Sequence, residues 1–191
     1  MKLIFVLISL LYLSNSFCQK NAETIYKWSD VQTANPDTIY SLSLSKLKLT
    51  NLPSSLWRFK NLKKLYLDRN KLSVLPDSFD LFENLEYLSL DHNQFEFFPM
   101  PITRLKHLQT FIASNNRLTY IPENIVNAKS LKKLDFYNNE IAEFGKGIFQ
   151  LKLLNYLDIS GTMYGTVIQK ELEDKLVGVK IIMDPPCKCL D

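Results

Sequence analysis

The sequence of 191 residues predicts an α/β solenoid, a right-handed superhelix of short coils with a parallel β-sheet along one side. Three observations support this fold class. The same frame of apolar residues returns every 23 residues between positions 39 and 167, apolar and polar residues alternate at the start of each unit, and an asparagine follows that stretch in four consecutive units. A unit of this length cannot bury its apolar side alone, so it must stack against identical neighbours.

The first 18 residues are expected to lie outside the fold. Lys2 supplies a basic start, and an apolar run from Leu3 to Leu13 follows before small and polar residues. This layout is typical of a secretory signal peptide, cleaved after Cys18. An uncleaved membrane anchor is one alternative, which the shortness of the run against the ~20 residues of a membrane-spanning helix disfavours. We therefore expect a protein that is secreted or held in the periplasm or cell envelope, without a stable membrane span after cleavage. Lipidation of Cys18 is the other alternative, which the bulky Phe17 disfavours.

Residues 19–38 are expected to cap the N-terminal end, because the open end of a solenoid exposes its core. Ile25, Trp28 and Val31 recur at helical spacing, and the pair Asn35-Pro36 ends this pattern. The spacing predicts a short capping helix with Trp28 packed into the core.

Six units cover residues 39–167. Apolar or aromatic residues fill positions one, four, six, eleven and fourteen of each unit, and proline holds position fifteen in the first four. Positions four and six predict a short strand with one buried face, and parallel pairing with the next strand requires a crossover. The second half of the unit supplies it, beginning after a proline and burying two apolar residues as one turn of helix or 3₁₀ helix would. The units begin at Ile39, Leu62, Leu85, Leu108, Leu131 and Leu154.

Position nine is the only polar position that holds the same residue in four consecutive units. The chain turns inward there, and an unpaired buried backbone group costs ~1–3 kcal/mol. An amide side chain offers both a donor and acceptors, so stacked asparagines can satisfy neighbouring turns. Leu47 and Thr162 replace asparagine in the two end units, which have only one neighbour each. The predicted ladder consists of Asn70, Asn93, Asn116 and Asn139.

The unit LxxLxLxxNxLxxLPxx(I/F)xx(L/F) resembles the leucine-rich repeat. It is similar to the 23-residue class of Ras-scaffold and Scribble-type proteins and of many exported bacterial proteins. The resemblance implies a parallel sheet on the concave face, short helical or 3₁₀ crossovers on the convex face, and caps at both ends. After Val167, IQKELEDKLVG predicts a helix ending at Gly178, and Val179 to Met183 predicts an edge strand. Residues 168–191 thus form the expected C-terminal cap with its cysteine-containing tail.

The strand side chains that are not buried are expected to point onto the concave face and to bind a partner protein. Their mix of Tyr, Ser, Asn and Asp resembles a paratope, although Tyr and Thr also favour strands in general. An aromatic and apolar run on consecutive strands marks the centre of this surface. The candidate contact residues are Tyr66, Lys64, Arg69, Tyr87, His92, Ile112, Asp135, Tyr137, Tyr156 and Asp158.

Composition and motifs argue against other classes of function. A net charge of +3 is too mild for a nucleic-acid or anionic-membrane binder. Ser89, Asp91 and His92 supply the residue types of a catalytic triad, but no oxyanion donors accompany them. The chain has no aspartate-rich calcium loop and no glycine-rich phosphate loop. We expect no catalytic, metal or cofactor site. The alternatives to protein binding are an envelope scaffold and a carbohydrate-binding module that uses the tyrosines.

Two cysteines, Cys187 and Cys189, follow the last predicted strand. Export would expose them to an oxidising compartment, so we expect a local or terminus-pinning disulfide, although one across a single intervening residue is strained. Two thiolates from one chain are too few for a closed zinc site, which leaves a soft-metal site or an intermolecular link as alternatives.

Replacing Cys187 and Cys189 together with serine should leave the solenoid folded, with a melting temperature changed by only a few degrees. Both residues lie beyond Pro185-Pro186, outside the repeats, and surface changes there carry little energy. Thermal unfolding followed by circular dichroism measures this. A loss of cooperative unfolding would instead make the tail part of the cap.

Overall fold

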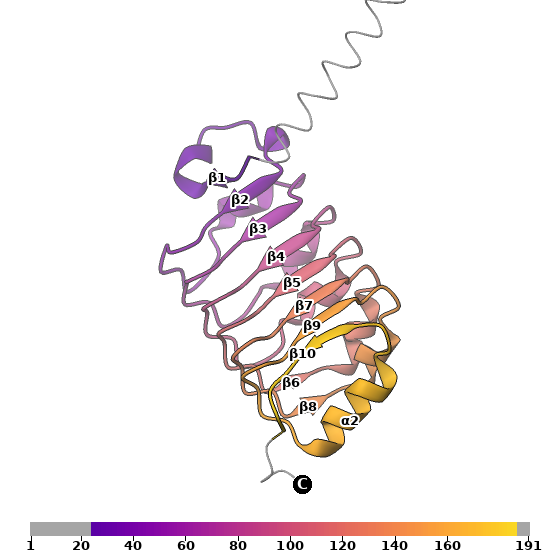
Figure 1. Cartoon of the computed structure of the whole chain (residues 1–191). Helices are drawn as coiled ribbons and strands as arrows, with labels where there is room; N and C mark the ends of the chain where they lie inside the picture. Colours follow the sequence, from indigo (N-terminus) through magenta and orange to yellow (C-terminus); the bar gives the residue numbers. More distant parts are fainter. Residues whose placement is uncertain (1–23, 187–191) are drawn as a thin grey trace, which may run out of the picture.

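Eight parallel strands form one continuous sheet along the computed structural model, which describes residues 24–186 (Figure 1). The predicted signal peptide, Cys18, Cys187 and Cys189 lie outside the described residues. The order β1-β2-β3-β4-β5-β7-β9-β10 follows the chain, which confirms the predicted solenoid. The strands are β1 Tyr26–Lys27, β2 Ser41–Ser43, β3 Lys64–Tyr66, β4 Tyr87–Ser89, β5 Thr110–Ile112, β7 Lys133–Asp135, β9 Tyr156–Asp158 and β10 Lys180–Ile182.

The strands of the six repeats pair in register at steps of 23 residues. Leu42 lies opposite Leu65, which lies opposite Leu88, and the same step continues to Leu157. Because the register equals the repeat, each repeat position forms a straight column across the sheet. The apolar columns at positions one, four and six are buried inside the coil.

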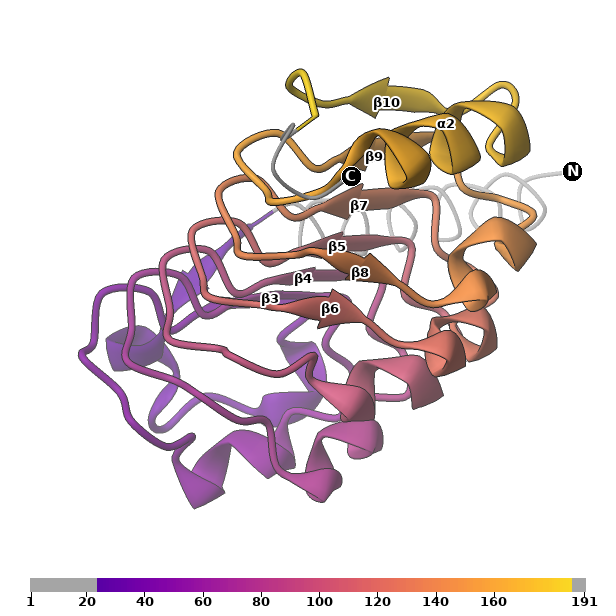
Figure 2. The same cartoon turned by 90° about the horizontal axis from the view of Figure 1, so that it is seen from below.

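Short 3₁₀ helices form the crossovers, as the position of the prolines predicts. Each begins directly after a proline of position fifteen or, in the fifth repeat, after Gly145, and Figure 2 shows them stacked in a row along the coil. Proline lacks an N–H, so it cannot donate a hydrogen bond to a neighbouring strand, and the extended segment ends there. The helices are η3 Ser54–Arg58, η4 Asp77–Leu81, η5 Met100–Arg104, η6 Glu123–Asn127 and η7 Lys146–Gln150.

A second, two-stranded parallel sheet joins β6 Tyr120–Ile121 to β8 Glu143–Phe144, in front of the main sheet in Figure 2. The repeat pattern does not predict this second sheet. Its position follows from two glycines. A Cβ on Gly145 would lie 2.5 Å from the backbone nitrogen of Glu123, and one on Gly147 would lie 1.9 Å from the Glu123 carbonyl oxygen. Only residues without side chains allow the fifth coil to approach the fourth so closely.

The N-terminal cap differs from the predicted helix. The chain forms the strand β1, the 3₁₀ helix η1 Trp28–Val31 and the 3₁₀ helix η2 Pro36–Thr38. Ile25, expected on a buried helix face, is 51% exposed, whereas Trp28 packs edge-on against Phe59 with ring centroids 6.0 Å apart. The free edge of β2 explains the difference, because an added strand pairs backbone groups that a helix would leave open.

A crossover side chain ties this cap to the first repeat. The Arg58 guanidinium donates to the carbonyl oxygens of Val31 at 2.5 Å and Gln32 at 2.9 Å, and it lies 4.7 Å from the centroid of the Phe59 ring. Arg58 is therefore a structural residue.

At the C-terminal end, where the sequence predicts a helix and an edge strand, the chain forms α2 Thr166–Lys175 and then β10, which pairs with β9. Helix α2 covers the end of the coil in Figure 1, with Leu172 and Leu176 buried. The Tyr164 hydroxyl donates to the Asp184 carbonyl and so attaches the segment after β10 to the last repeat.

The position-nine asparagines are buried, and each connects two coils. The Asn93 amide nitrogen donates to the carbonyl oxygens of Leu67 and Leu90, both at 3.0 Å, and its oxygen accepts the Leu72 N–H at 3.0 Å. Asn70, Asn116 and Asn139 repeat these contacts one coil apart. In the last repeat the Thr162 hydroxyl donates only to the Ile159 carbonyl of its own coil.

Asn93→Ala should lower the free energy of unfolding by ~1–3 kcal/mol, because it leaves buried backbone groups on two coils without a hydrogen-bond partner. Asn155→Ala, at an exposed position directly before β9, should cost under ~0.5 kcal/mol. Urea denaturation measures both. Equal losses would contradict the role assigned to the ladder.

Candidate functional site

The outer side of the eight-stranded sheet, formed by repeat positions three, five, seven and eight, is called the sheet face below. All ten candidate contact residues lie on it and are at least partly exposed. They come from β3, β4, β5, β7 and β9 or from the turns that follow these strands. Strands lie ~4.8 Å apart, so side chains on adjacent strands touch or nearly touch.

Two tyrosines form the centre of the sheet face. Tyr66 on β3 and Tyr87 on β4 are diagonal neighbours, and their ring centroids are 4.9 Å apart at an interplanar angle of 41°. Burial raises the pKa of the Tyr87 hydroxyl to about 12 and also raises the pKa of Tyr66. Both hydroxyls therefore stay protonated at neutral pH and can donate hydrogen bonds. Ile112 on β5 is the diagonal neighbour of Tyr87 and extends this apolar centre.

A network of carboxylates and hydroxyls lies beside the tyrosines. Asp68 accepts hydrogen bonds from the Ser89 hydroxyl and from the Asp91 N–H at 3.1 Å. Asp91 accepts from the Asn115 amide at 2.9 Å and contacts the His92 ring nitrogen at 2.7 Å. Burial raises the pKa of Asp68. Burial also acts to raise the pKa of Asp91, but the hydrogen bonds from Asn115 and His92 outweigh it, and that pKa is lowered.

This network does not make a triad. Ser89 is 3% exposed and donates to Asp68, while His92 contacts Asp91, so the serine hydroxyl is engaged away from the imidazole. A nucleophilic serine needs a hydrogen bond to its base. The arrangement orders the surface but has no geometry for acyl transfer.

Two carboxylates stand side by side at the C-terminal end of the sheet face. Asp135 on β7 and Asp158 on β9 are directly opposite each other. Asp135 accepts the Tyr137 N–H at 3.3 Å, and Asp158 accepts from the Ser160 hydroxyl at 2.6 Å. Neither forms an ion pair with lysine or arginine within residues 24–186. Like charges in this position destabilise a sheet. Burial, and then the charge of Asp158, raise the pKa of Asp135 despite the Tyr137 hydrogen bond.

The turn after each strand has a feature that the sequence analysis missed. Every residue at position eight has a positive φ, including Arg69 at 54° and His92 at 52°. Such a left-handed conformation costs most residues ~1–2 kcal/mol, whereas asparagine and glycine adopt it readily. In the sequence, this conformation is indicated by the residues Asn115, Asn138 and Gly161 in the same column. Arg69 and His92 thus stand on sharply turned backbone at the border of the sheet face.

Residues 24–186 contain no group of three or more His, Cys, Asp or Glu side chains placed to hold a metal ion. Within the same residues, no helix has the length and apolar character needed to cross a membrane.

Comparisons with known proteins agree with the repeat pattern. A family profile described as leucine-rich repeat matches residues 37–95, and no curated protein matches the chain. A leucine-rich-repeat protein of Leptospira interrogans superimposes with a TM-score of 0.70 at 27% identity, covering 87% of this chain and 49% of that one. An internalin of Listeria monocytogenes, InlF, gives 0.66 at 25% identity, with 80% and 43% covered. Internalin C2 of the same organism gives 0.65 at 21% identity, with 82% and 66% covered. The chain spans about half the length of the first two.

Asp135→Asn should raise the urea midpoint of unfolding at pH 7. The raised pKa means that the ionised carboxylate is less stable in the folded state than in the unfolded chain, and asparagine keeps the acceptor for Tyr137 without the charge. The gain should shrink as the pH falls through the raised pKa and vanish below the ordinary value of 3.8, where both states are protonated.

Asp91→Asn is the matched control, with the opposite sign. Its lowered pKa predicts a loss of stability at pH 7, which disappears when the pH falls below the folded-state pKa. Urea unfolding at a series of pH values measures both variants. A destabilised Asp135→Asn protein at pH 7 would contradict the electrostatic cost assigned to Asp135.

Proposed function

This chain is a leucine-rich-repeat protein, and we propose that it is an exported module that binds another protein on its sheet face. Repeat folds of this kind are typically non-catalytic, and the sheet face offers contact area and hydrogen-bonding groups without a reactive arrangement. The observation that carries the proposal is the Tyr66–Tyr87 pair, held at the centre of a polar surface. Tyrosines supply large contact area at a low cost in conformational entropy and are enriched at interface hot spots.

The charges around the pair support a directed complex. Exposed basic side chains lie in the turns after β2 and β3, whereas Asp135 and Asp158 lie on β7 and β9 at the other end. A partner with an apolar centre and opposite charges at its two ends would dock in one direction only. Its cations would also offset the repulsion within the aspartate pair. The basic residues are Lys46, Lys48, Arg69 and Lys71.

Export is the second half of the proposal, and it rests on the pattern of residues 1–18. Mass spectrometry of the N-terminus of the mature protein tests it. A chain that begins at Gln19 supports cleavage after Cys18. A lipid mass on Cys18 would favour the alternative of an envelope-anchored protein, and an intact Met1 would contradict export by this signal.

Tyr66→Ala and Tyr87→Ala should each weaken partner binding by ~2 kcal/mol, about 30-fold in Kd, if the tyrosines are anchors. Partners are captured from envelope extracts with the wild-type protein, identified, and titrated against each variant. Removing Lys48 and Lys71 together should mainly slow association and reduce its dependence on salt. Capture of glycans in place of a protein would favour the carbohydrate-binding alternative.

Lys106→Ala is the control, because Lys106 is exposed on the crossover after η5. Arg58 is unsuitable for this purpose, since its contacts to Val31 and Gln32 hold the N-terminal cap. A larger loss of binding from Lys106→Ala than from the tyrosine variants would overturn the assignment to the sheet face.

A further inference from the structure

A second row of side-chain hydrogen bonds joins the coils at position twenty-three, where each crossover ends. The Asn61 amide donates to the carbonyl oxygen of Asp37 at 3.0 Å, and the Asn84 amide donates to that of Lys60 at 3.3 Å. The Ser130 hydroxyl donates to the carbonyl oxygen of Lys106 at 2.6 Å. In each case the acceptor lies 24 residues earlier in the chain.

Leu153 interrupts this row. The equivalent acceptor, 24 residues before Leu153, is the Lys129 carbonyl, which accepts no hydrogen bond from any donor within residues 24–186. The leucine side chain is 51% exposed, so it neither caps the carbonyl nor joins the core. A residue that breaks a local rule without a structural gain is expected at functional sites.

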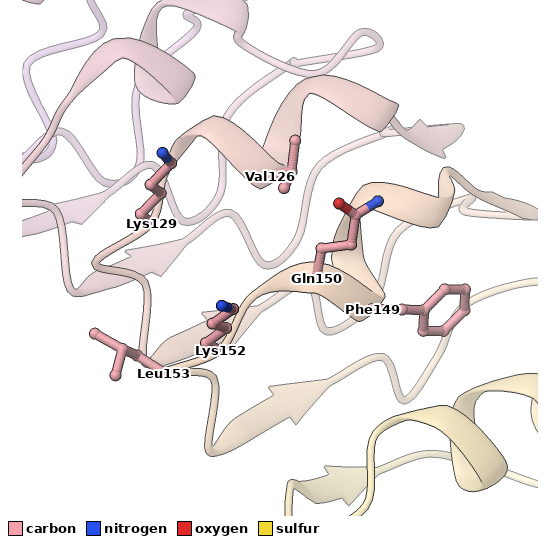
Figure 3. Close-up of a pocket in the computed structure, with 6 residues that line it drawn as sticks. All are labelled: Val126, Lys129, Phe149, Gln150, Lys152 and Leu153. Carbon is pink, nitrogen blue, oxygen red and sulfur yellow. The ribbon is translucent and has the colours of Figure 1, made fainter.

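A depression of about 720 Å³ lies at this interruption, between η6 and η7. Its apolar lining comes from Val126, Phe149 and Leu153, and Lys129 and Lys152 stand beside it. In Figure 3 the two lysines and Leu153 gather at the ends of the two helices, while Phe149 points away toward α2. There the ammonium of Lys175 lies 4.8 Å from the centroid of its ring.

The two lysines carry uncompensated charge. Neither Lys129 nor Lys152 forms an ion pair among the described residues. A second depression lies beside His107, which is the other described position-twenty-three residue without a hydrogen bond to the preceding coil, but the charges that line it are different. Asp80 and Glu83 line it together with Arg104, which is paired with Asp80 at 3.3 Å. Of these two depressions, the one at Leu153 combines exposed aliphatic surface, an open carbonyl and positive charge without a neighbouring carboxylate in its lining.

We propose that this depression docks an acidic, apolar peptide segment of a partner protein, on a surface separate from the sheet face. Separate aliphatic side chains of the segment pack on Val126 and on Leu153, carboxylates pair with Lys129 and Lys152, and a backbone N–H donates to the Lys129 carbonyl. A basic segment is excluded by like charge, and a purely acidic one leaves the leucine uncovered.

The test uses three fluorescein-labelled octapeptides, in which glutamate alternates with leucine, lysine with leucine, or glutamate with serine. Binding is measured by fluorescence anisotropy, and the site is located by amide shifts of the ¹⁵N-labelled protein. The glutamate–leucine peptide should bind and shift the amides of Val126, Lys129 and Leu153. Equal binding of either other peptide, or shifts confined to the sheet face, would overturn the proposal.

Leu153→Asn is the decisive variant, because it restores the hydrogen bond that Asn61 and Asn84 make. It should keep or raise the melting temperature while weakening the glutamate–leucine peptide at least tenfold. Lys129→Ala combined with Lys152→Ala should weaken the peptide to a similar extent, and Leu153→Ser replaces Leu153→Asn if the latter unfolds. Tyr66→Ala should leave peptide binding unchanged, which separates this proposal from the proposed function. An unchanged affinity of the Leu153→Asn variant for the glutamate–leucine peptide would overturn the proposed docking at this depression.

Discussion

The hydrogen bonds of the buried asparagines are the interaction on which the rest of the structure depends. Each coil turns inward after its strand, and the turn leaves backbone groups facing the apolar core. In the four middle coils, one amide side chain bonds to carbonyls of its own and the preceding coil, as Asn93 does with Leu90 and Leu67. The ladder therefore supplies hydrogen-bond partners to these backbone groups and also sets the spacing of the coils. The 23-residue register of the sheet follows from that spacing.

This register decides what the sheet face can be. Because every repeat position becomes a column, residues 23 positions apart in the chain become neighbours on the surface. Diagonal contact between Tyr66 and Tyr87 arises in this way, and so does the direct opposition of Asp135 and Asp158. The first arrangement brings two aromatic rings together on the sheet face, and the second keeps an unfavourable charge pair at the end of that face. A surface of this kind gives up stability that a partner can restore.

Departures from the repeat account for the local features of the molecule. Gly145 and Gly147 remove the side chains that would hold the fourth and fifth coils apart, and a second sheet forms between them. Leu153 replaces a polar residue and leaves a carbonyl open beside an apolar depression. Arg58 extends from a crossover to hold the N-terminal cap. Each change acts on one coil and its neighbour, as expected for a chain in which contacts are between adjacent units.

The sequence by itself determined the solenoid, its six repeats, the parallel register and the column to which each candidate residue belongs. Periodicity carries this information, because a fixed step places equivalent residues on equivalent coils. Only the tertiary structure decided the features that depend on contacts across coils or at the ends. Among these are the strand β1 in place of a helix, the left-handed turn at Arg69 and His92, and the engagement of Ser89 by Asp68. A sheet edge, a backbone angle and a hydrogen bond between strands leave no periodic trace, so they could not be predicted from the repeat alone.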